Sequence, residues 1–578
     1  MAVQIPAKRW EIYPRAPEAH LAQFSDVPRL VTQILYNRGI FRQNEVHQFI
    51  DALSDSDDPF LMKGITEAVD EIFCVMEAGG LIAVYGDYDA DGVTSTTLMT
   101  QALQTLGAKV EPYIPDRFDE GYGLNKQAIA ELAKKGVALI VTVDCGIRSA
   151  DETAYGNSLG LKFVITDHHQ VPRDDNGYDV TPPAAAVINP KQQACAYPFK
   201  DLAGGGGAYK LAQALKIAAP SQKTGRPGLQ EEDLLDLVAI GTVADMVPLV
   251  GENRALVKRG LHYINQPQRV GLKALIEQTQ LKAGRITAGT IGFTLGPRLN
   301  AAGRLTHALG AYRLLSTTDP AEAQKLAAEL HRINVERQQM TRQFVNSARA
   351  QIMQGDSLEP LYLITAPEFN EGVVGLVASR LTEQFYRPTL VARRGETRTK
   401  GSGRSIPEFD ITRALDQCAD LLVKYGGHAA AAGFTILNEN LDAFRERLTA
   451  IAGETFDSAS LKKTLSVDAE INLRGVTHQL VDDIQNLRPF GYGNPTPRFV
   501  TKNLEVKFHK LVGKEKNHLK LNLFDGKQMW DAIGFGLGEL WPSIPRGTRL
   551  DAVYTLEFNT WNGTTRLQLN LKDIRGSG

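Results

Sequence analysis

Three aspartates on alternate positions, Asp87, Asp89 and Asp91, stand in the stretch YGDYDADG, which ends in Gly92. Carboxylates at this spacing begin the calcium loop of an EF-hand, but that loop needs a glutamate at its twelfth position, where this chain has Leu98. The preceding residues, LIAVY, are a short apolar run typical of a buried strand. We therefore expect the acids to lie at the C-terminal end of a strand, where they could bind a catalytic metal ion.

Polar clusters also follow three other apolar segments. Asp144 ends ALIVTVD, the triplet Asp167-His168-His169 follows FVIT, and Asp245 follows the helical run DLVAIGTVA. Ligands of an open parallel sheet bind beyond the carboxyl ends of its strands, so these clusters are expected to meet the first one in a single crevice. Alone, Asp245 would be interpreted as a helix-end cap, and adjacent histidines in a strand would face opposite sides. Their occurrence together favours one shared site.

Aspartates and histidines without cysteine indicate a site for Mn²⁺ or Mg²⁺, with Zn²⁺ less favoured by so many carboxylates. The cluster offers more groups than one ion needs, so we expect two divalent cations, an arrangement that hydrolyses phosphate esters. The expected metal ligands are Asp87, Asp89, Asp91, Asp144, His168 and Asp245. The expected catalytic groups are Asp87, Asp144, His168 and His169. For Asp87, a role as a ligand and a role as a base beside the ligands both stay open.

These side chains need a scaffold, and the pattern between about residues 80 and 250 predicts a parallel sheet of repeated βαβ units. The expected strands are 81–86, 109–115, 138–144, 162–167 and 185–190. A long helix is expected next, because Asp319, Pro320 and Glu322 form a helix-start signal of the capping-box type. A second α/β region follows. After about residue 465, short strands without helical periodicity predict a small barrel of the OB type.

Composition indicates a folded protein of several domains. The chain has 578 residues, of which 43% are hydrophobic and 22% charged, with a formal net charge of −2. An anionic partner must therefore be held by a local patch rather than by the overall field. Four scattered cysteines and an N-terminus without the apolar core of a signal peptide predict a cytoplasmic location.

Four stretches of the sequence carry a family resemblance. YGDYDADG, VDCG, TDHH and GTVADMVPL resemble the four motifs of the DHH phosphoesterase superfamily. Further stretches resemble the RecJ family of bacterial single-stranded-DNA exonucleases, and the likeness runs over about residues 25–578. These stretches are 296–305, 371–381, 401–410, 425–434 and 488–499.

The resemblance implies an α/β multidomain protein built on a parallel-sheet DHH core. The expected parts are an N-terminal segment packing on the core (1–50), the DHH catalytic domain (51–316), a long connecting helix (317–356), a second α/β, DHH-associated domain (357–460) and a C-terminal OB-fold β-barrel (461–578).

The resemblance also implies a function, the 5′-to-3′ removal of mononucleotides from single-stranded DNA with Mn²⁺ or Mg²⁺, in recombination and DNA repair. The implied substrate is single-stranded DNA with a free 5′ end, and the implied partners are single-strand-binding protein and a RecQ-type helicase. Two alternatives are a DHH hydrolase of small substrates and a non-catalytic scaffold that keeps the fold. The long helix and the OB-like region argue against the first, and the complete set of acids argues against the second.

Several residues are expected to hold the DNA strand. Arginine can pair with a phosphate through two hydrogen bonds, and tyrosine can stack on a base. The expected phosphate and DNA ligands are Arg117, Tyr122, His169, Arg298, Asn300, Arg304, Ser402, Arg404, Ser405 and His428. We expect GPRLNAAGR to be a turn and helix start, and KGSGRS to be a glycine-rich loop whose backbone N–H groups approach a phosphate.

Two further features bear on DNA binding. RecJ-like chains commonly have Trp-His before the EGVVG helix, where this chain has Phe369-Asn370, so Asn370 is not among the expected ligands. In the OB-like region, residues 501–527 carry seven lysines against three acids. Clustered lysines with phenylalanines are typical of a non-specific, salt-sensitive groove for single strands.

Overall fold

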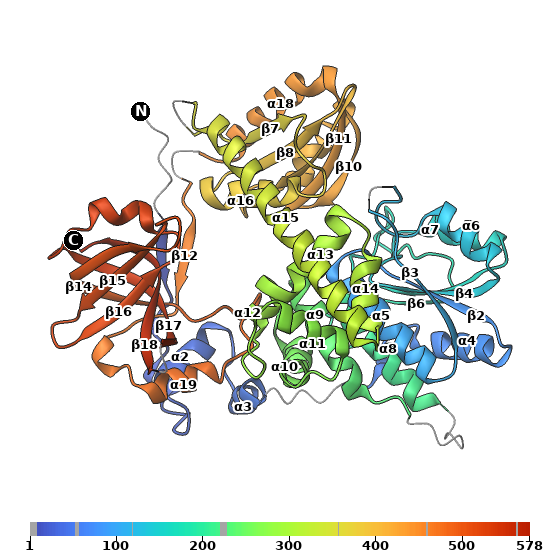
Figure 1. The fold of residues 1–578 in the computed structure, drawn as a ribbon, viewed down its shortest axis with the longest axis horizontal. Coiled ribbons are helices and arrows are strands. Elements are labelled where there is room, and N and C mark those ends of the chain that lie inside the picture. Colours follow the sequence, from blue (N-terminus) through green and yellow to red (C-terminus); the bar gives the residue numbers. More distant parts are fainter. Residues whose placement is uncertain are drawn as a thin grey trace. The chain divides into compact units, whose positions relative to one another are not determined.

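The computed structural model describes residues 8–51, 57–117, 119–219, 228–355, 358–457, 461–561 and 564–577 (Figure 1). The chain divides into two compact units. The large unit is Ala16–Asn334 with Thr477–Pro497, and the small unit is Met1–Arg15, Val335–Val476 and Arg498–Gly578. The expected domain boundary at 356/357 falls outside the described ranges, and the one at 460/461 falls at the edge of a described range. No described helix is both long and apolar enough to cross a membrane.

A five-stranded sheet is the centre of the large unit. Its strands are β2 (Leu81–Tyr85), β3 (Lys109–Tyr113), β4 (Val137–Val143), β5 (Lys162–Thr166) and β6 (Ala186–Ile188). All neighbours pair in parallel, in the order β3-β2-β4-β5-β6. The five expected strands and their parallel arrangement are therefore confirmed.

Helices cover both faces of this sheet, because alternate strand residues point to opposite sides. Ala83 and Tyr85 of β2 belong to one apolar core with α6 (Lys126–Lys134), beside α7 (Ala150–Ser158). Ile82 and Val84 belong to another core with α4 (Ile65–Glu77), α5 (Ala90–Thr105) and α8 (Gly204–Ala218). Figure 1 shows the two helical layers above and below the strands.

A helical layer completes the large unit. Its site-bearing elements are α9 (Leu235–Ala244), the π-helix η3 (Ile291–Leu295) and α13 (Gly296–Leu305). The other elements are α1 (Glu18–Leu21), α2 (Arg29–Asn37), α3 (Gln43–Asp51), η1 (Pro59–Leu61), η2 (Glu231–Leu234), α10 (Gly251–Asn265), α11 (Val270–Gln278), α12 (Ala288–Thr290), α14 (Leu309–Ser316) and α19 (His478–Gln485).

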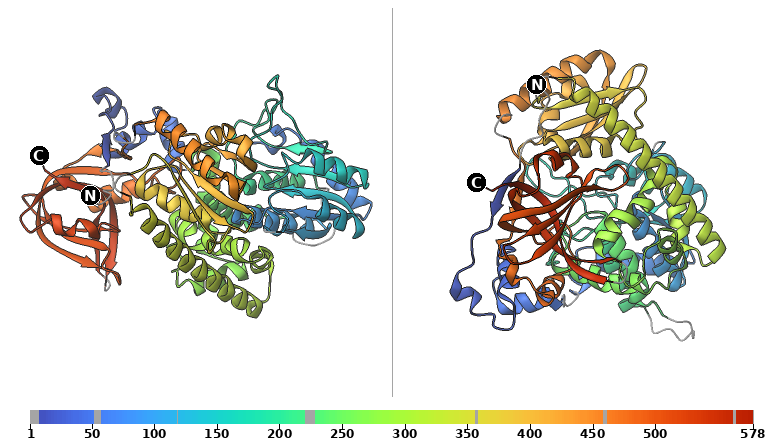
Figure 2. Two further views of the ribbon diagram at one scale, coloured as in Figure 1. Left: turned by 90° about the horizontal axis from the view of Figure 1, so that it is seen from above. Right: turned by 60° about the vertical axis from the view of Figure 1, so that its left-hand side comes forward.

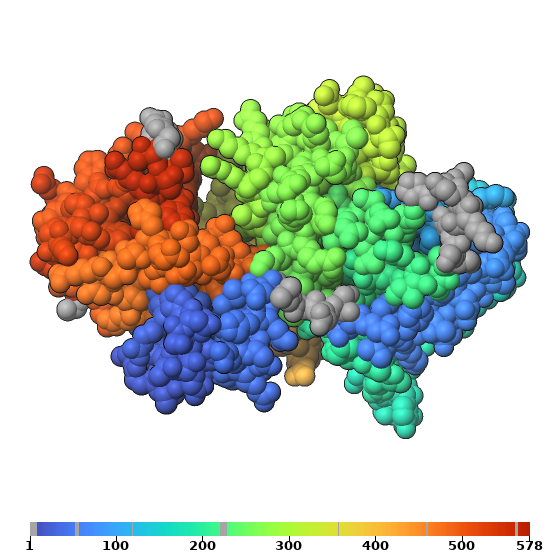
Figure 3. Space-filling view, turned by 90° about the horizontal axis from the view of Figure 1, so that it is seen from below, coloured from blue at the N-terminus to red at the C-terminus, as the bar shows by residue number. Residues whose placement is uncertain are grey.

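A late segment of the chain returns to this layer, where α19 lies beside α2 and α3 (Figures 1 and 3). Buried Arg254 on α10 holds it, donating hydrogen bonds to the backbone oxygens of Phe49 (2.9 Å), Leu487 (3.0 Å) and Arg488 (2.7 Å). One guanidinium thus ties segments that are more than 200 residues apart in sequence.

The long helix is α15 (Pro320–Ile352), slightly shorter than expected. The Asp319 carboxylate accepts the N–H of Ala321 at 2.9 Å, as an N-cap residue does. Glu322 accepts the hydroxyl of Thr317 at 2.6 Å. The division between the two units falls within this helix, after Asn334.

The small unit begins with a mixed sheet in the order β10-β11-β9-β8-β7. Its strands are β7 (Tyr362–Ala366), β8 (Thr389–Arg394), β9 (Arg398–Arg404), β10 (Leu422–His428) and β11 (Ala431–Leu437), and its helices are α16 (Val374–Phe385), α17 (Ile411–Asp416), η4 (Ala419–Leu421), η5 (Asn438–Asn440) and α18 (Leu441–Thr455). The expectation that KGSGRS is a loop was wrong, because residues 400–404 lie in β9 and pair with both β8 and β11. Glycine at 401 lets the strands approach, since a Cβ there would lie 2.5 Å from Ala392 Cβ.

A closed barrel ends the small unit (Figure 2). Its strands are β13 (Ala469–Glu470), β14 (Phe499–Val512), β15 (His518–Phe524), β16 (Met529–Gly534), β17 (Arg549–Trp561) and β18 (Thr564–Gly576), with η6 (Leu473–Gly475) and η7 (Gly538–Ser543). The sheet order is β13-β14-β15-β16-β18-β17, and pairing of β14 with β17 closes it, as expected for an OB-fold. Beside it, β1 (Arg9–Ile12) pairs in parallel with β12 (Thr464–Val467).

Candidate metal centre

The loop between β2 and α5 begins the site. Asp89 caps α5, because its Oδ1 accepts the backbone N–H groups of Asp91 (2.9 Å) and Gly92 (3.0 Å). Asn300 on α13 accepts the N–H of Ala90 at 2.8 Å. A Cβ on Gly92 would lie 2.5 Å from the backbone oxygen of Asp87, so only glycine fits there. These contacts hold the three aspartates of the loop in one fixed turn.

Buried Asp91 faces the start of α8. Its two carboxylate oxygens accept the N–H groups of Gly204 (2.7 Å) and Gly205 (3.0 Å), at a helix N-terminus that favours negative charge. A Cβ on Gly204 would lie 2.5 Å from Asp144 Cβ, and one on Gly241 would lie 2.3 Å from Asp91 Oδ1. This glycine cradle was not predicted from the sequence, where its signal is the run GGGG that opens α8.

Asp144 follows β4 with a left-handed backbone, at φ 63°. Such a conformation costs a non-glycine residue about 1 to 3 kcal/mol, and residues held in it cluster at functional sites. The side chain is buried, and its Oδ1 lies 3.1 Å from His168 Nε2, although neither atom makes a hydrogen bond. The backbone of Asp144 thus places its Oδ1 next to Nε2 of His168, and neither atom has a hydrogen-bond partner.

His168 is held neutral. Burial lowers its pKa to about 3, and the neighbouring charge of His169 acts in the same direction. One ring nitrogen therefore keeps a lone pair at physiological pH. Nε2 lies 3.1 Å from Asp144 Oδ1 and 3.6 Å from Asp245 Oδ2, so a cation shared with these carboxylates could bind the ring.

His169 has the opposite charge state. Burial disfavours its protonated form, but the hydrogen bond and ion pair with Asp167 outweigh this and raise the pKa of His169 to about 9. Its Nδ1 lies 2.7 Å from Asp167 Oδ1 and 3.2 Å from Tyr122 Oη. Asp167 also accepts the N–H groups of Ile147 (2.9 Å) and His168 (2.7 Å), so it fixes the whole triplet. At physiological pH, therefore, His168 is neutral and can bind a cation, whereas His169 is protonated.

Asp245 enters from the helical layer. It is the C-cap residue of α9, and its N–H donates to the backbone oxygen of Gly241 at 2.9 Å. The next residue, Met246, has a left-handed backbone at φ 63°, the conformation that glycine usually adopts after a helix C-cap. The end of α9 thus brings Asp245 to the ends of β2, β4 and β5.

These residues form three overlapping groups of potential ligands. Within the described part of the chain, the ligand atoms of each group all lie within 4.8 Å of one another. The groups are Asp87-Asp89-Asp144, Asp91-His168-Asp245 and Asp144-His168-His169. The structure thus brings together all the expected metal ligands and catalytic groups.

The electrostatics of the cluster fit divalent cations. Burial, followed by repulsion from neighbouring aspartates, raises the pKa of Asp91 to about 7 and that of Asp245 to about 8. The same causes raise the pKa values of Asp87 and Asp144 well above their usual range. Buried Asp87 Oδ1, Asp144 Oδ1 and His168 Nε2 lack hydrogen-bond partners. Mn²⁺ or Mg²⁺ would satisfy these atoms and neutralise the excess charge.

Of the arginines of the large unit that were expected to bind DNA, two lie near the metal loop and one contacts other helices. Arg117 lies near the metal loop, with its guanidinium carbon 4.9 Å from the centre of the Tyr88 ring. Arg304 also lies near this ring, because its positive charge acts to lower the pKa of Tyr88, which burial raises. Arg298 donates to the backbone oxygen of Thr294 (2.7 Å) and to His331 Nδ1 on α15 (3.3 Å). The helix start expected at 296–304 is confirmed, because α13 begins at Gly296, but the expected turn is wrong, since α13 continues directly from η3.

Asn300, an expected DNA ligand, supports the metal loop. Its Oδ1 holds the first turn of α5, and a role of its amide NH2 group in binding a phosphate stays a prediction. This contact joins residues 210 positions apart in sequence, so no local pattern could indicate it.

A separate polar cluster lies in the small unit. Arg404 Nη1 donates to Ser402 Oγ at 2.9 Å, and a Cβ on Gly375, in the first turn of α16, would lie 2.9 Å from Arg404 Nη2. An arginine, a serine and a helix N-terminus together suit an anion. Ser405 instead donates its hydroxyl to the backbone oxygen of Phe409 at 2.6 Å.

His428 ends β10, and its pairing partner in β11, Ala431, pairs in turn with Arg404 of β9. Its Nδ1 accepts the N–H of Ala430 at 3.3 Å. His428 therefore lies at the same end of the small unit's sheet as Arg404.

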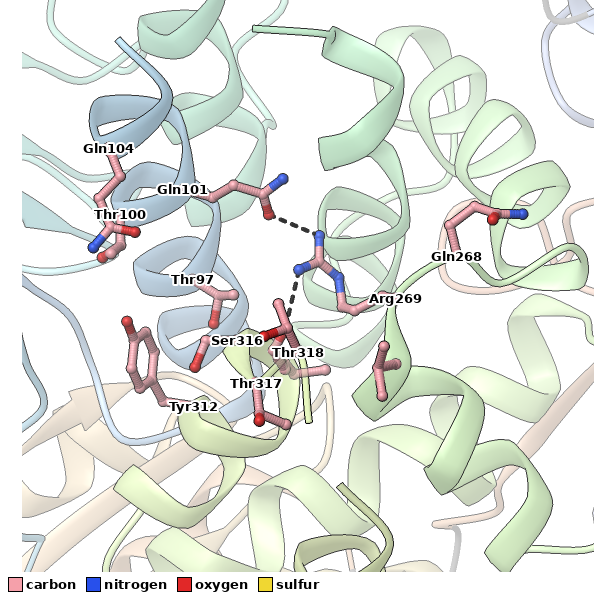
Figure 4. Close-up of a pocket in the computed structure, with 12 residues that line it drawn as sticks. Thr97, Thr100, Gln101, Gln104, Gln268, Arg269, Tyr312, Ser316, Thr317 and Thr318 are labelled. Atoms are coloured by element: carbon pink, nitrogen blue, oxygen red, sulfur yellow. Dashed lines mark hydrogen bonds between the residues drawn. The ribbon is translucent and has the colours of Figure 1, made fainter. Parts of the chain in front are cut away.

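Arg269 supports α5 and α9, two helices that position residues of the metal centre. Figure 4 shows Arg269 between α5 and the end of α14, beside a cavity of about 350 Å³. Arg269 donates to Gln101 of α5 (3.1 Å), to Asp236 of α9 (2.9 Å) and to the backbone oxygen of Leu315 (3.0 Å). Since α5 begins at the metal loop and α9 ends at Asp245, this network fixes their relative position.

Arg269→Ala is expected to lower the free energy of unfolding by about 3 to 5 kcal/mol, because it leaves Asp236 as a nearly buried charge without a partner. Urea unfolding followed by circular dichroism measures the change. Lys135→Ala, which removes the exposed pair with Glu111, is the matched control and should cost less than about 1 kcal/mol. Equal effects of the two substitutions would contradict the supporting role of Arg269.

Comparison with known proteins identifies three family domains in the chain. The DHH family N-terminal domain matches residues 81–242, the DHHA1 domain matches 360–454 and the RecJ OB domain matches 467–573. These matches cover the parallel sheet, the mixed sheet and the barrel.

Relatives match nearly the whole chain. The single-stranded-DNA-specific exonuclease RecJ of Bacillus subtilis is 38% identical over 573 residues, covering 98% of this chain and 70% of that protein. Crystal structures of RecJ from Thermus thermophilus also match. The one in complex with Mn²⁺ has a TM-score of 0.83 at 31% identity, covering 99% of this chain and 80% of that one, and the one with Mg²⁺ has a TM-score of 0.78 at 29% identity, covering 99% and 79%.

Proposed function

The chain belongs to the RecJ family of single-stranded-DNA-specific exonucleases, and we propose that it removes 5′-mononucleotides from single-stranded DNA in the 5′-to-3′ direction with two divalent cations. The observation that carries the proposal is the set of three overlapping ligand groups at the ends of β2, β4 and β5. They share Asp144 and His168 and offer more ligands than one ion takes.

The proposed ligands are the buried carboxylates and the neutral ring of the cluster. They are Asp87, Asp89, Asp91, Asp144, His168 and Asp245. Mn²⁺ or Mg²⁺ bound there would lower the pKa of a water molecule and neutralise charge on the phosphate. Asp144 belongs to the group with Asp87 and Asp89, and its Oδ1 lies 3.1 Å from Nε2 of His168, which belongs to the group with Asp91 and Asp245, so Asp144 is the proposed bridging carboxylate. The backbone N–H groups that hold Asp91 limit its freedom to turn toward an ion.

His169 is the proposed acid of the reaction. Asp167 holds its Nδ1, so the protonated ring can donate from Nε2 to the oxygen of the leaving group. Tyr122 also contacts Nδ1, and we expect it to limit the rotation of the ring. Asp167 would thus orient the imidazolium and stabilise its charge.

Positive groups would hold the strand in each unit. Arg117 and Arg304 lie near Tyr88, next to the metal loop, and are proposed phosphate ligands. In the small unit, Ser402 and Arg404 beside the start of α16 are a second proposed phosphate site, with His428 at the same end of the sheet. The lysines of residues 501–527 and exposed Phe508 on β14 would bind further nucleotides.

We place this activity in recombination and DNA repair, in the cytoplasm. A RecQ-type helicase would supply single strands, and single-strand-binding protein would cover them before degradation. Both partners are proposed from the family resemblance alone.

A comparison of linear and circular strands tests the proposal. With Mn²⁺, we expect a linear strand labelled at its 5′ end to release the label as a mononucleotide, while a circular strand of the same sequence stays intact. A strand labelled at its 3′ end should shorten gradually and keep its label until late. Cleavage of the circle, or early release of the 3′ label, would contradict the end-dependent 5′-to-3′ reaction.

A further inference from the structure

Among the described residues, three of the four most exposed large apolar side chains of the large unit lie on segments that contact one another. Phe293 on the π-helix η3 is 86% exposed, Met246 after α9 is 71% exposed and Tyr492 is 65% exposed. Single exposed apolar side chains are common, but several on connected segments are a candidate binding surface, because covering apolar surface is favourable. None of the three has a role in the site described above.

All three are attached to the segment that carries Asp245. Gly292, next to Phe293, would place a Cβ 3.7 Å from Val243 Cγ1, and Gly296 would place one 3.4 Å from Ala244 Cβ. The π-helix therefore packs on the two residues that precede Asp245. A π-helix within a helical region often marks a functional site.

Tyr492 approaches the same segment from the other direction. Its backbone oxygen accepts the N–H of Leu249 at 2.7 Å. A Cβ on Gly493 would lie 2.9 Å from Pro248 Cβ, and one on Gly491 would lie 2.7 Å from Leu249 Cδ1. The loop that carries Tyr492 is therefore in close contact with residues three and four positions after Asp245.

Met246 is notable for its backbone. It follows the C-cap of α9 with φ 63°, where glycine is the least strained residue. A long apolar side chain at this position gains little from packing, because most of it is exposed. Stability alone therefore does not account for methionine here.

We propose that Met246, Phe293 and Tyr492, called the apolar platform, bind the bases of the single strand next to the metal centre. This inference rests on the proposed function and adds the bases to the contacts with the phosphates. Aromatic rings stack on every base, and a thioether makes favourable contacts with aromatic rings, so such a platform binds strands without regard to sequence. Because the three residues lie on segments that carry Asp245 or pack against its neighbours, bases bound to the platform would lie beside the phosphate that is cleaved.

Equilibrium binding tests the platform separately from catalysis. We would measure the anisotropy of a 3′-labelled oligonucleotide without divalent cations, so that no cleavage occurs. Phe293→Ala and Tyr492→Ala are each expected to weaken binding by about 5- to 100-fold, the range for loss of one stacked base. Tyr178→Ala is the matched control, because Tyr178 is a similarly exposed aromatic residue (69%) with no link to Asp245, and its effect should stay below about twofold.

An oligonucleotide that lacks its bases sharpens the test. The wild-type protein should bind it more weakly, and Phe293→Ala should cause no further loss, because the contact is already missing. If Phe293→Ala weakened binding of the abasic and the normal strand by the same factor, or matched Tyr178→Ala on the normal strand, the proposal would be overturned.

Met246→Gly separates binding from stability. The substitution removes the side chain and relaxes the backbone, so weaker binding is expected with an unchanged or higher melting temperature. A lower melting temperature with unchanged binding would show that Met246 serves packing, and would overturn its place in the platform. If the wild-type protein bound single strands but failed to degrade them with Mn²⁺, the proposed function would fail while the platform stood.

Discussion

Asp144→Asn is expected to lower kcat for single-stranded DNA by about 10³-fold or more, the scale seen when one member of an interdependent catalytic group is removed. Asp144 contributes to two of the three ligand groups, and its Oδ1 has no hydrogen-bond partner that a substitution would break. Asparagine keeps the shape of the side chain but removes the charge that two cations would share. Release of mononucleotides from a 5′-labelled strand, at saturating DNA and Mn²⁺, measures the change.

Two controls show whether the loss reflects metal binding. Asp151→Asn removes an exposed carboxylate in the first turn of α7 and should leave kcat within about twofold of wild type. The second control is the rise in melting temperature that Mn²⁺ produces, which should be smaller in Asp144→Asn than in the wild type. Unchanged activity in Asp144→Asn, or an unchanged effect of Mn²⁺, would contradict the assignment.

The rise in melting temperature that Mn²⁺ produces should depend on pH, because the aspartates of the metal centre have raised pKa values. In the metal-free protein the pKa of Asp91 is raised to about 7 and that of Asp245 to about 8. Carboxyl groups with raised pKa values bind protons more tightly in the folded than in the unfolded state, so the metal-free protein loses stability as pH rises through these values. A cation removes that repulsion, and its stabilising effect should accordingly be larger at about pH 8 than at about pH 6.

The scaffold of this site could be predicted from sequence because its signals are local. Four of the five strands of the parallel sheet are short apolar runs, and three of them are followed by the polar residues that form the centre. The end of a parallel strand fixes the edge of the sheet to which such residues belong, so Asp144 and His168 could be placed together without coordinates. The presence of Asp245 was predictable only because three other clusters pointed to the same edge.

The parts that could not be predicted depend on contacts between distant segments. The N–H groups of Gly204 and Gly205 reach Asp91 across more than 110 positions, and Asn300 reaches Ala90 across 210. KGSGRS resembled a phosphate-binding loop because glycine is common in such loops. In the structure glycine serves there to let strands approach, and the pairing of β9 with two neighbours uses the backbone groups that a loop would have offered to a phosphate.

His169→Gln is expected to lower kcat by about 100-fold or more, because it removes the proposed acid while keeping a hydrogen-bonding side chain. The Asp167 ion pair raises the pKa of His169 to about 9, so the ring carries a proton at neutral pH and loses it as pH rises. Wild-type kcat should therefore fall on the alkaline side, at or below about pH 9, since nearby cations also repel the proton. A profile of kcat against pH, measured on a 5′-labelled strand, tests this.

Asp167→Asn distinguishes an acid from a group that only binds the phosphate. Without the carboxylate, the pKa of His169 should return toward its ordinary value, and the alkaline fall of kcat should move to lower pH. If His169 only bound the phosphate, Asp167→Asn would instead raise KM and leave the pH of the alkaline fall in kcat unchanged. The same alkaline fall in His169→Gln as in wild type would assign that titration to another group, because glutamine has no proton to lose in this range.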